Sequence, residues 1–295
     1  MEEIIFITGA TASGKSEIAI WLAKKINGEI INADSRQVYK YLDIGSGKIT
    51  EKERKLVKHY LLDIAHPKRN YSLGQWLKGV EKIIKKIKKE NKVPIICGGT
   101  ILYLKALKEG WFLPQVKPDY KLRKKLEKLD INELYKILLK VDPNRAKTIQ
   151  KENKRRLIRA IEIAYKLGQV PSLKKEPKYE ILIVAPYIEF DKLEKKIYKR
   201  LLKRVEKIIE EIKNLRTLGL SFNKIISFGL EYEWFGKYVK GEIDLKTAIE
   251  KCYKDVRRFA KKQLNELKKL DYVYWFKNKK DLLKKVKNFL KNENG

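Results

Sequence analysis

The 295-residue sequence predicts an α/β fold in which a parallel sheet is flanked by helices and an all-helical domain is inserted. Three observations lead to this prediction. Strand-sized apolar runs alternate with amphipathic helical patterns early in the chain, residues 119–167 contain only helical patterns, and the alternation then resumes. We therefore expect a core made of residues 1–115 and 177–295, and an inserted helical domain made of residues 116–176.

The chain is organised around a glycine-rich loop close to its start. The apolar run 4–8 (IIFIT) is followed by GATASGKS and then by a helical pattern with apolar residues at Ile18, Leu22 and Ile26. The glycine and Lys-Ser spacing matches a P-loop, and the order of strand, loop and helix is the context which that motif requires. We therefore expect a P-loop NTPase-like core that binds a diphosphate or a triphosphate. The expected ligands are Gly9, Ala10, Thr11, Ala12, Ser13, Gly14, Lys15 and Ser16.

Each part of this loop has a distinct expected role. Backbone N–H groups converge on phosphate oxygens, with the positive end of the following helix behind them. Lys15 adds a charge at the terminal phosphate, and the Ser16 hydroxyl is an expected inner ligand of Mg²⁺. The alternative is an accidental glycine and serine turn before an amphipathic helix. Because one such loop serves kinases, ATPases, GTPases and transferases, the motif alone does not identify the reaction.

The remaining strands and helices are predicted from the periodicity of apolar residues and from the residues that begin or end helices and turns. Further strands are expected at 30–33, 93–97, 181–184 and 272–276. Within the insertion, helical patterns occupy 130–141, 143–149 and 153–167. In the core, helices are expected just past Ser35, from Ser72 to about residue 90, after Gly98-Gly99-Thr100, from about residue 191 to 215, between 243 and 269, and near the end of the chain.

The charge of the chain points to a polyanionic partner. Lys and Arg number 69 against 37 Asp and Glu, which gives a formal net charge of +32 and a pI near 9.8. Nucleic acid is the leading candidate. A heat-adapted, Lys-rich composition is the alternative, and we expect both to contribute. Arg155, Arg156 and Arg159 fall at i, i+1 and i+4 of a predicted helix, where they form either a stripe along a phosphate backbone or a solvated face.

Cysteine and histidine usage restricts the chemistry. Cys97 and Cys252 are far apart in sequence, so no disulfide framework is expected and a reducing cytosol is favoured. With His59 and His66 as the only histidines, zinc sites and His-based triads are not expected. The chain opens with no signal sequence and its apolar runs are strand-sized. We expect a cytoplasmic protein, not inserted in a membrane, that acts as a monomer.

Asp34 is the candidate general base. It follows the second predicted strand, and the carboxyl ends of parallel strands face the ligand, so it should lie beside the phosphate loop. Ser35, Arg36 and Gln37 follow on the same rim, and Gly98-Gly99-Thr100 reaches it from the next strand. A carboxylate there can take a proton from an attacking nucleophile. The alternatives are that Asp34 caps a helix or holds Mg²⁺ through water, and that Thr100 is only an N-cap.

Taken together, these stretches resemble the tRNA dimethylallyltransferases, also called tRNA isopentenyltransferases. The resemblance covers nearly the whole chain, and the phosphate loop, DSRQVY and GGT in this order and spacing are highly specific. The segments that carry it are GATASGKS (9–16), DSRQVYKYLDIGSGK (34–48), KHYLLDI (58–64), PIICGGTILYLKALKEG (94–110), RRLIRAIEIAYKLGQVPS (155–172), KRLLKRVE (199–206), KGEIDL (240–245) and RRFAKKQL (257–264).

The resemblance implies a reaction and a set of site residues. A dimethylallyl group would pass from dimethylallyl diphosphate to N6 of adenosine 37 of tRNA, with release of diphosphate and with Mg²⁺ as cofactor. Asp34 would contact the flipped-out adenine and act as its base, with Lys15 and Thr100 also at the catalytic centre. The helical insertion would grip the anticodon stem-loop. The expected tRNA contacts are Asp34, Ser35, Arg36, Gln37, Thr100, Arg123, Arg155, Arg156, Arg159, Lys261, Lys262 and Gln263.

The chain also departs from the pattern of this family. Gly229-Leu230-Glu231 stands where many bacterial members have Gly-Tyr-Arg, and Glu266 replaces a common tryptophan. Ser16 replaces the usual threonine and keeps the hydroxyl. Two other functions use the same motifs. One is a small-molecule or nucleoside kinase with Asp34 as base, which would consume ATP without RNA; the other is an RNA-binding protein with a structural or switching nucleotide.

Overall fold

A computed structural model describes residues 1–291 of the chain. The chain divides into two compact units: the core unit is Met1–Glu109 with Pro177–Gly295, and the insertion unit is Gly110–Glu176. The first boundary therefore lies before the expected residue 115. The reason is a two-stranded antiparallel ribbon, in which β5 (Trp111–Phe112) pairs with β6 (Lys174–Lys175) and ties both connectors to the insertion.

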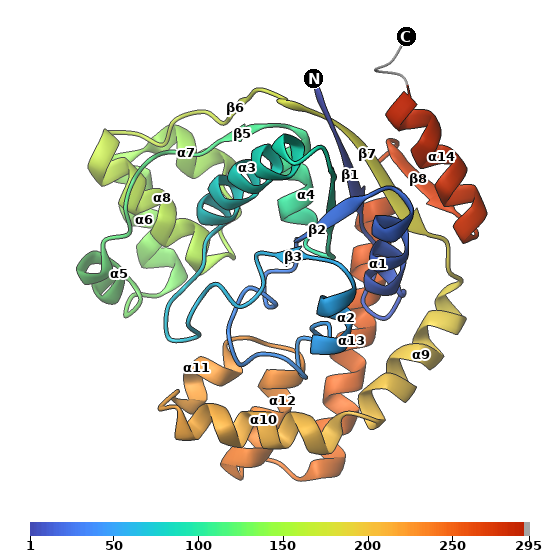
Figure 1. Cartoon of the computed structure of the whole chain (residues 1–295). Coiled ribbons are helices and arrows are strands. Elements are labelled where there is room, and N and C mark those ends of the chain that lie inside the picture. The colour runs from blue at the N-terminus through green and yellow to red at the C-terminus, as the bar shows by residue number, and fades with distance from the viewer. Residues whose placement is uncertain (292–295) are drawn as a thin grey trace. The chain divides into compact units, whose positions relative to one another are not determined.

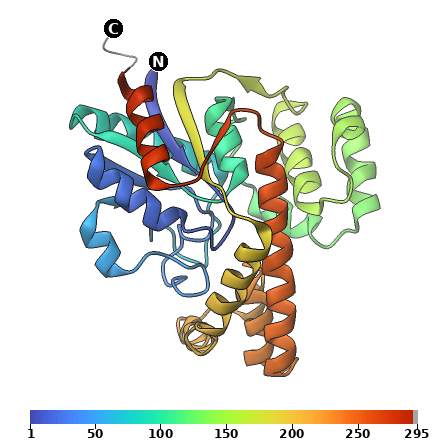
Figure 2. The same cartoon turned by 90° about the vertical axis from the view of Figure 1, so that its right-hand side faces the viewer.

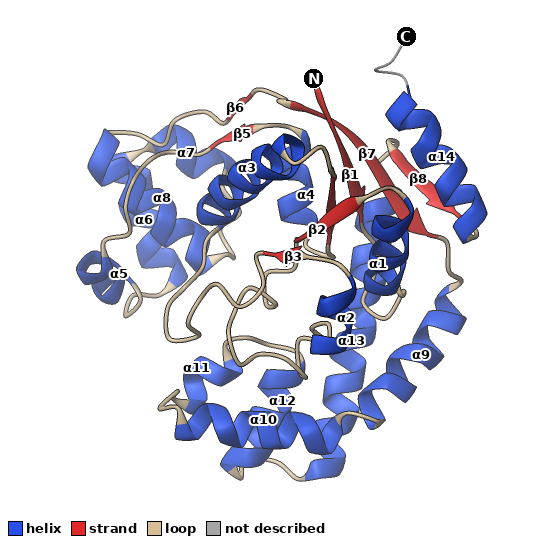
Figure 3. Cartoon of the chain, viewed as in Figure 1, coloured by secondary structure: helices blue, strands red, loops and turns tan. Residues whose placement is uncertain are grey.

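The core unit contains a six-stranded, all-parallel sheet, as expected from the alternating pattern. The strand order is β3-β2-β4-β1-β7-β8 (Figure 3). Five of the strands were expected from the sequence, whereas β3 is only two residues long and gives too short an apolar run to be recognised. The bounds are β1 Glu2–Ile7, β2 Gly28–Asn32, β3 His59–Tyr60, β4 Val93–Cys97, β7 Tyr179–Pro186 and β8 Val273–Phe276.

Helices cover both faces of this sheet (Figures 1 and 2). On one face, α1 (Lys15–Lys25) and α14 (Lys279–Lys291) pack on Ile5 and Ile7. On the other face, α3 (Leu73–Lys89) and α4 (Ile101–Lys108) contact the strands. Strands that are apolar on both faces are typical of such a sheet. Ser72 begins α3 as expected, because its side chain and that of Gln75 form a reciprocal capping box.

A bundle of five helices follows β7 in the core unit. The single helix expected from residue 191 to 215 is wrong, because the chain breaks at Lys203-Arg204 into α9 and α10. Arg204 has φ −117°, and its guanidinium donates to the carbonyls of Ile44 and Gly45. The break therefore lets a cation between the two helices bind a loop that is distant in sequence. Figure 2 shows α9 beside the long α13. The bounds are α9 Phe190–Leu202, α10 Val205–Thr217, α11 Phe222–Ile226, α12 Glu231–Lys240 and α13 Leu245–Lys268.

The helix expected just past Ser35 is also wrong. Turns occupy the chain from there to α2 (Glu51–Leu56), and Tyr41 has φ +66°, in the left-handed region that a helix cannot contain. Val38 and Leu42 instead pack into the core of the helix bundle. This long turn region is therefore held by tertiary contacts, which local propensity does not reveal.

The insertion unit is mainly helical, as expected. Its own core contains Leu126, Leu134, Leu138 and Leu157, which come from three of its helices. The bounds of its helices are α5 Tyr120–Leu126, α6 Ile131–Val141, α7 Pro143–Thr148 and α8 Lys154–Leu167. Across residues 1–291, no helix combines the length and the apolar character needed to cross a bilayer.

Candidate active site

The phosphate loop opens into a cavity of about 220 Å³ at the carboxyl end of the sheet. Gly14 takes a left-handed conformation, φ +86°, at the start of α1, and no side chain caps that helix. The first N–H groups of α1 therefore lack a partner within the helix, and Lys15 and Ser16 line the cavity beside them. A helix end left open in this way binds anions.

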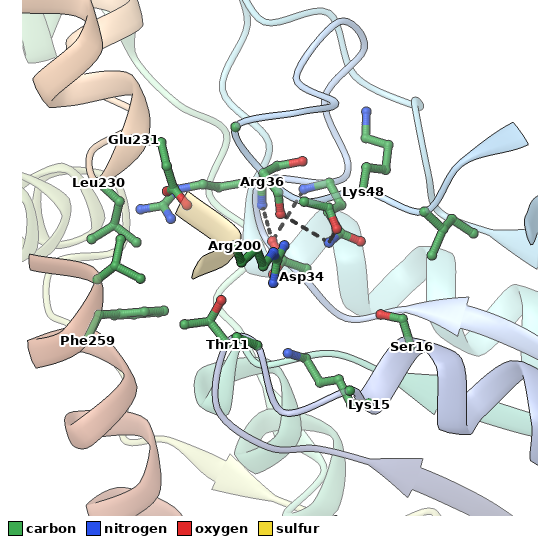
Figure 4. A pocket seen from close by; sticks show the side chains of 18 of the residues that line it. Thr11, Lys15, Ser16, Asp34, Arg36, Lys48, Arg200, Leu230, Glu231 and Phe259 are labelled. Atoms are coloured by element: carbon green, nitrogen blue, oxygen red, sulfur yellow. Dashed lines mark hydrogen bonds between the residues drawn. The ribbon is translucent and has the colours of Figure 1, made fainter. Parts of the chain in front are cut away.

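Lys15 brings a cation into this cavity (Figure 4). Its Nζ donates to the carbonyl of Ala10 at 3.2 Å, and it forms no ion pair with any residue between 1 and 291. Burial lowers the pKa of Lys15 from its ordinary value of 10.5, and the nearby Asp34 acts in the opposite direction. Burying a charge beside only a neutral acceptor is costly, and a bound anion would compensate for it.

Asp34 lies on the same cavity, and Lys15 extends towards it (Figure 4). No helix follows Asp34, so it is not a helix cap. Its Oδ1 accepts the N–H groups of Arg36 at 2.8 Å and Gln37 at 3.3 Å. Its backbone is held by the buried Asn32, whose side chain bonds both the N–H and the carbonyl of Asp34. Oδ2 receives no hydrogen bond from the described part of the chain, so it is the oxygen available to a substrate.

Of the other expected rim residues, some line the cavity and others form hydrogen bonds that hold the loops around it. Arg36 and Gln37 line the cavity. Gln37 also donates through Nε2 to the carbonyls of Ser46 and Gly47, both at 3.3 Å. Thr100 is the N-cap residue of α4, but its side chain makes no capping hydrogen bond; its Oγ1 instead accepts the N–H of the exposed Ser35 at 3.0 Å. The structure thus joins the ends of β2 and β4, which the sequence predicts to meet.

Arg200 is a cavity residue that sequence reasoning missed. It comes from α9, lies in Figure 4 near Asp34, and adds a guanidinium to a cavity that Lys15, Arg36 and Lys48 also line. A Cβ at Gly47 would lie 1.7 Å from its guanidinium, so a side chain there would displace it. A signal existed in the sequence, because Arg200 stands next to Leu201 and three residues after Ile197, both buried on the inner face of α9.

The wall of the cavity formed by residues 45–48 is held by two buried side chains. The carboxylate of Glu211 accepts the N–H groups of residues 43–45 at 2.6 to 3.0 Å. Tyr232 donates its hydroxyl to Glu211 at 2.7 Å and accepts the N–H of Ser46 at 3.1 Å. Burial, with the adjacent Glu211 carboxylate, raises the pKa of Tyr232 well above 10, so its hydroxyl stays a donor. Neither residue was expected from the sequence.

Another part of the cavity is apolar. Leu230, Val256 and Phe259 line it, the last two from α13. Leu230 has φ +47°, an uncommon conformation for a leucine, and Glu231 lies beside it (Figure 4). The departure at Gly229-Leu230-Glu231 therefore changes the cavity itself, since an apolar and an acidic side chain stand where the resemblance leads us to expect tyrosine and arginine.

In the insertion unit, two of the arginines expected to contact tRNA are bonded to a glutamate, and two are exposed. Arg123 donates to both oxygens of Glu162, at 2.8 and 2.7 Å. Arg159 pairs with the same carboxylate and donates to the carbonyl of Val116 at 2.9 Å. Although burial acts to raise it, the pKa of Glu162 is lowered because these arginines hydrogen-bond to the carboxylate. Arg155 and Arg156 are exposed on α8.

The expected basic segment of α13 also contains both exposed and buried residues. Lys261 and Lys262 are exposed, as expected for residues that meet a polyanion. Gln263 is only 5% exposed, and both polar atoms of its side chain are bonded inside the core unit. Gln263 therefore does not extend the exposed basic surface of Lys261 and Lys262, and it lines the cavity instead. Glu266, at the position of the missing tryptophan, pairs with Lys105 at 3.8 Å.

No self-sufficient metal centre occurs in the described residues, where no three His, Cys, Asp or Glu side chains group together. Magnesium bound with phosphate does not need one, since it keeps waters and uses one or two protein ligands. The Ser16 hydroxyl and the Asp34 carboxylate both line the cavity. These oxygen ligands fit a magnesium ion that is held chiefly by the phosphate groups of a ligand.

The parallel sheet and the glycine-rich loop at its carboxyl end define a protein of the P-loop class. Comparison with known families then narrows the class. The model of the IPP transferase family matches residues 37–270, and the chain belongs to that family. The phosphate loop and Asp34 precede the matched segment, so the family assignment does not depend on them.

Whole-chain relatives agree with this assignment. A tRNA dimethylallyltransferase of Thermoanaerobacter sp. (strain X514) is 36% identical, over 98% of this chain and 97% of its own. One of Halothermothrix orenii is 37% identical, over 92% and 87%. Among solved structures, the full-length tRNA isopentenylpyrophosphate transferase of Bacillus halodurans has a TM-score of 0.72 at 30% identity, covering 99% of this chain and 96% of its own.

Proposed function

We propose that the chain transfers a dimethylallyl group from dimethylallyl diphosphate to N6 of adenosine 37 in tRNA, giving N6-isopentenyladenosine and diphosphate. The observation that carries this proposal is the arrangement of the cavity, which is lined both by Lys15 at the open end of α1 and by Asp34, whose Oδ2 accepts no hydrogen bond from the described residues. A site for an anionic leaving group and a proton acceptor thus share one space. Relatives across the whole chain are named tRNA dimethylallyltransferases.

The donor binds with its diphosphate on the phosphate loop. The N–H groups at the start of α1, with Lys15 and Arg200, neutralise the charge that grows on the diphosphate as the C–O bond breaks. Leu230, Val256 and Phe259 offer the apolar surface that a dimethylallyl group needs. The loop therefore binds a leaving group, whereas in a kinase it would bind ATP. The kinase alternative leaves the apolar wall and the net charge of +32 unexplained.

Asp34 is the proposed general base. The exocyclic amine of adenine is a weak nucleophile that must lose a proton as the new C–N bond forms, and Oδ2 of Asp34 can accept it. Adenosine 37 lies in a single-stranded loop, from which a base can be extruded at small cost. The two N–H bonds to Oδ1 fix the carboxylate, so the base is oriented before the substrate arrives.

Magnesium is the proposed cofactor. Ser16, the second residue of α1, is its proposed protein ligand. When bound, the ion adds positive charge at the diphosphate oxygens and lowers the energy of the departing group. The protein itself contributes the fixed N–H groups and Lys15 at the same oxygens.

The exposed cations are the proposed tRNA contacts. Arg155 and Arg156 on the insertion unit and Lys261 and Lys262 on α13 are free of acidic partners in the described structure. We place Ser35, Arg36 and Thr100 close to the extruded base, and the insertion unit on the anticodon stem-loop. The enzyme acts as a monomer in the cytoplasm, where its tRNA substrate occurs.

The test is a reconstituted transfer reaction. The protein is incubated with dimethylallyl diphosphate, Mg²⁺ and an anticodon stem-loop with adenosines at positions 36 to 38, and the nucleosides are analysed by mass. We expect adenosine to gain one dimethylallyl unit, and a stem-loop with guanosine at position 37 to gain none. Consumption of ATP on a small substrate, with no mass gain on RNA, would establish the kinase alternative.

A further inference from the structure

Gln263 connects two loops that build the active site. It lies on α13 with its side chain turned into the core unit, where Oε1 accepts the N–H of Thr11 at 2.9 Å. Its Nε2 donates to the carbonyl of Gly99 at 2.8 Å. Thr11 belongs to the phosphate loop after β1, and Gly99 to the turn after β4. One buried amide thus bonds the ends of two neighbouring parallel strands.

The local sequence is built around this amide. A Cβ at Gly99 would lie 2.6 Å from Nε2 of Gln263, so only glycine allows the contact. The adjacent Gly98 is required for another reason, because its Cβ would lie 2.2 Å from the backbone of Ala33. The two glycines of the Gly98-Gly99-Thr100 turn therefore have separate roles, and the second makes room for the side chain of α13.

The connection continues to the proposed base. Thr100 follows Gly99, and its hydroxyl accepts the N–H of Ser35, the residue after Asp34. A continuous path of covalent and hydrogen bonds thus runs from the phosphate loop through Gln263 and Thr100 to the turn that carries Asp34. Gln263 therefore helps to fix the distance between the phosphate loop, where the leaving group would bind, and Asp34, the proposed base.

We propose that Gln263 is a positioning residue, which holds the phosphate loop in the shape that binds diphosphate and does not itself contact RNA. Its neighbours Lys261 and Lys262 are exposed, while Gln263 is 5% exposed with its carboxamide oxygen and nitrogen both bonded. In Lys261-Lys262-Gln263, the two lysines therefore lie on the exposed side of α13, whereas the glutamine lies on its buried side. The inference rests on the proposed function only in taking diphosphate as the ligand of the loop.

The test compares Gln263→Met with the matched variant Lys262→Met, which adds the same side chain one position away. Methionine keeps the length of glutamine and removes both hydrogen bonds. We measure the binding of inorganic diphosphate with Mg²⁺ by calorimetry, and the binding of a fluorescent anticodon stem-loop without donor by anisotropy. For Gln263→Met we expect diphosphate affinity to fall about tenfold and RNA affinity to stay within about twofold. Lys262→Met should show the reverse pattern.

A fall in RNA affinity with diphosphate binding unchanged would overturn the proposal and make Gln263 an RNA contact. A parallel loss of both affinities, with a lowered melting temperature, would overturn it as well, because the role would then be structural throughout. Where Gln263→Met does not fold, Gln263→Asn replaces it, since it keeps the amide but is too short to reach both loops. Neither measurement needs turnover, so failure of dimethylallyl transfer would overturn the proposed function alone.

Discussion

The phosphate loop of the core unit and the arginine cluster of the insertion unit both hold buried or half-buried cations, but their partners differ. Lys15 donates only to a backbone carbonyl. Arg123 and Arg159 share the carboxylate of Glu162, which is 3% exposed. A cation beside a neutral acceptor still gains from a bound anion, whereas a cation paired with a buried carboxylate would first have to leave it.

The comparison teaches that the partner of a cation, more than its residue type or its place on a helix, decides what it can bind. Arg155 and Arg159 lie one turn apart on α8 and look equivalent in the sequence. In the structure the first is exposed and the second is tied to Glu162. We therefore expect substitution of Lys15 to impair the reaction of the substrate, substitution of Arg159 to lower the stability of the fold, and substitution of Arg155 to lower RNA affinity.

The largest expected effect is at the base that faces Lys15. Asp34→Asn keeps the side-chain shape and one acceptor for the N–H groups of Arg36 and Gln37, but it removes the proton acceptor. We expect turnover to fall by about 10² to 10⁴ and RNA affinity to stay nearly unchanged, because a base acts in the transition state. Single-turnover rates and anisotropy separate the two quantities. An unchanged rate would remove Asp34 from the mechanism.

The next effect is at Lys15 itself. Lys15→Met should lower kcat/KM for the allylic diphosphate about 100-fold, since a preorganised charge at the leaving group is lost. In the wild type, kcat/KM should also fall as pH rises through the pKa of Lys15, because the neutral amine no longer attracts the anion. Burial lowers that pKa below 10.5, so the fall should begin at a lower pH than for an ordinary lysine.

The pH profile of Lys15→Met is the control for this prediction. Arg200 and the start of α1 remain in the variant, and neither loses its charge in the accessible pH range. The alkaline fall should therefore disappear from the profile of the variant. A fall that persists there would assign the titration to another group, and an undisturbed kcat/KM would show that the loop is not the donor site.

The difference between Lys15 and Arg159 also marks what the sequence could predict. The loop, the parallel sheet and the position of Asp34 follow from a local motif and from strand order, because the carboxyl ends of parallel strands meet at one edge. Such features depend on residues that are close in sequence. They were therefore predicted, together with the family that they indicate.

The supports of the site could not be predicted, because they join residues far apart in sequence. Glu211 bonds N–H groups of residues 43–45, and nothing near either segment indicates the other. Gln263 sits in a basic run whose composition indicates an exposed face. Arg200 is one of four cations in KRLLKR, and its spacing from the apolar Ile197 and Leu201 distinguishes it but does not reveal what the inner face of α9 meets. A buried polar residue becomes recognisable only when its partners are in place.

Breaking the arginine cluster should cost stability. Glu162→Gln leaves Arg123 and Arg159 without their shared carboxylate, and we expect the insertion unit to lose about 2 kcal/mol, since the arginines are partly exposed. Because its folded pKa is lowered, Glu162 stabilises the fold above its unfolded pKa, and that contribution disappears as pH falls through the folded value. Acid melting of wild type and variant should therefore converge. A variant with full stability at neutral pH would contradict the pairing.

The smallest effect is at Arg155, the exposed member of the same helix. Arg155→Ala removes a cation without an acidic partner in the described structure, so the melting temperature should not change. RNA affinity should fall by a few-fold, and the slope of log affinity against log salt should decrease by about one, as one phosphate contact is lost. Arg159→Ala is the matched comparison, with lower stability and an unchanged slope. If both variants changed the slope equally, the bond to Glu162 would not keep Arg159 from RNA, and the distinction between paired and unpaired cations would fail.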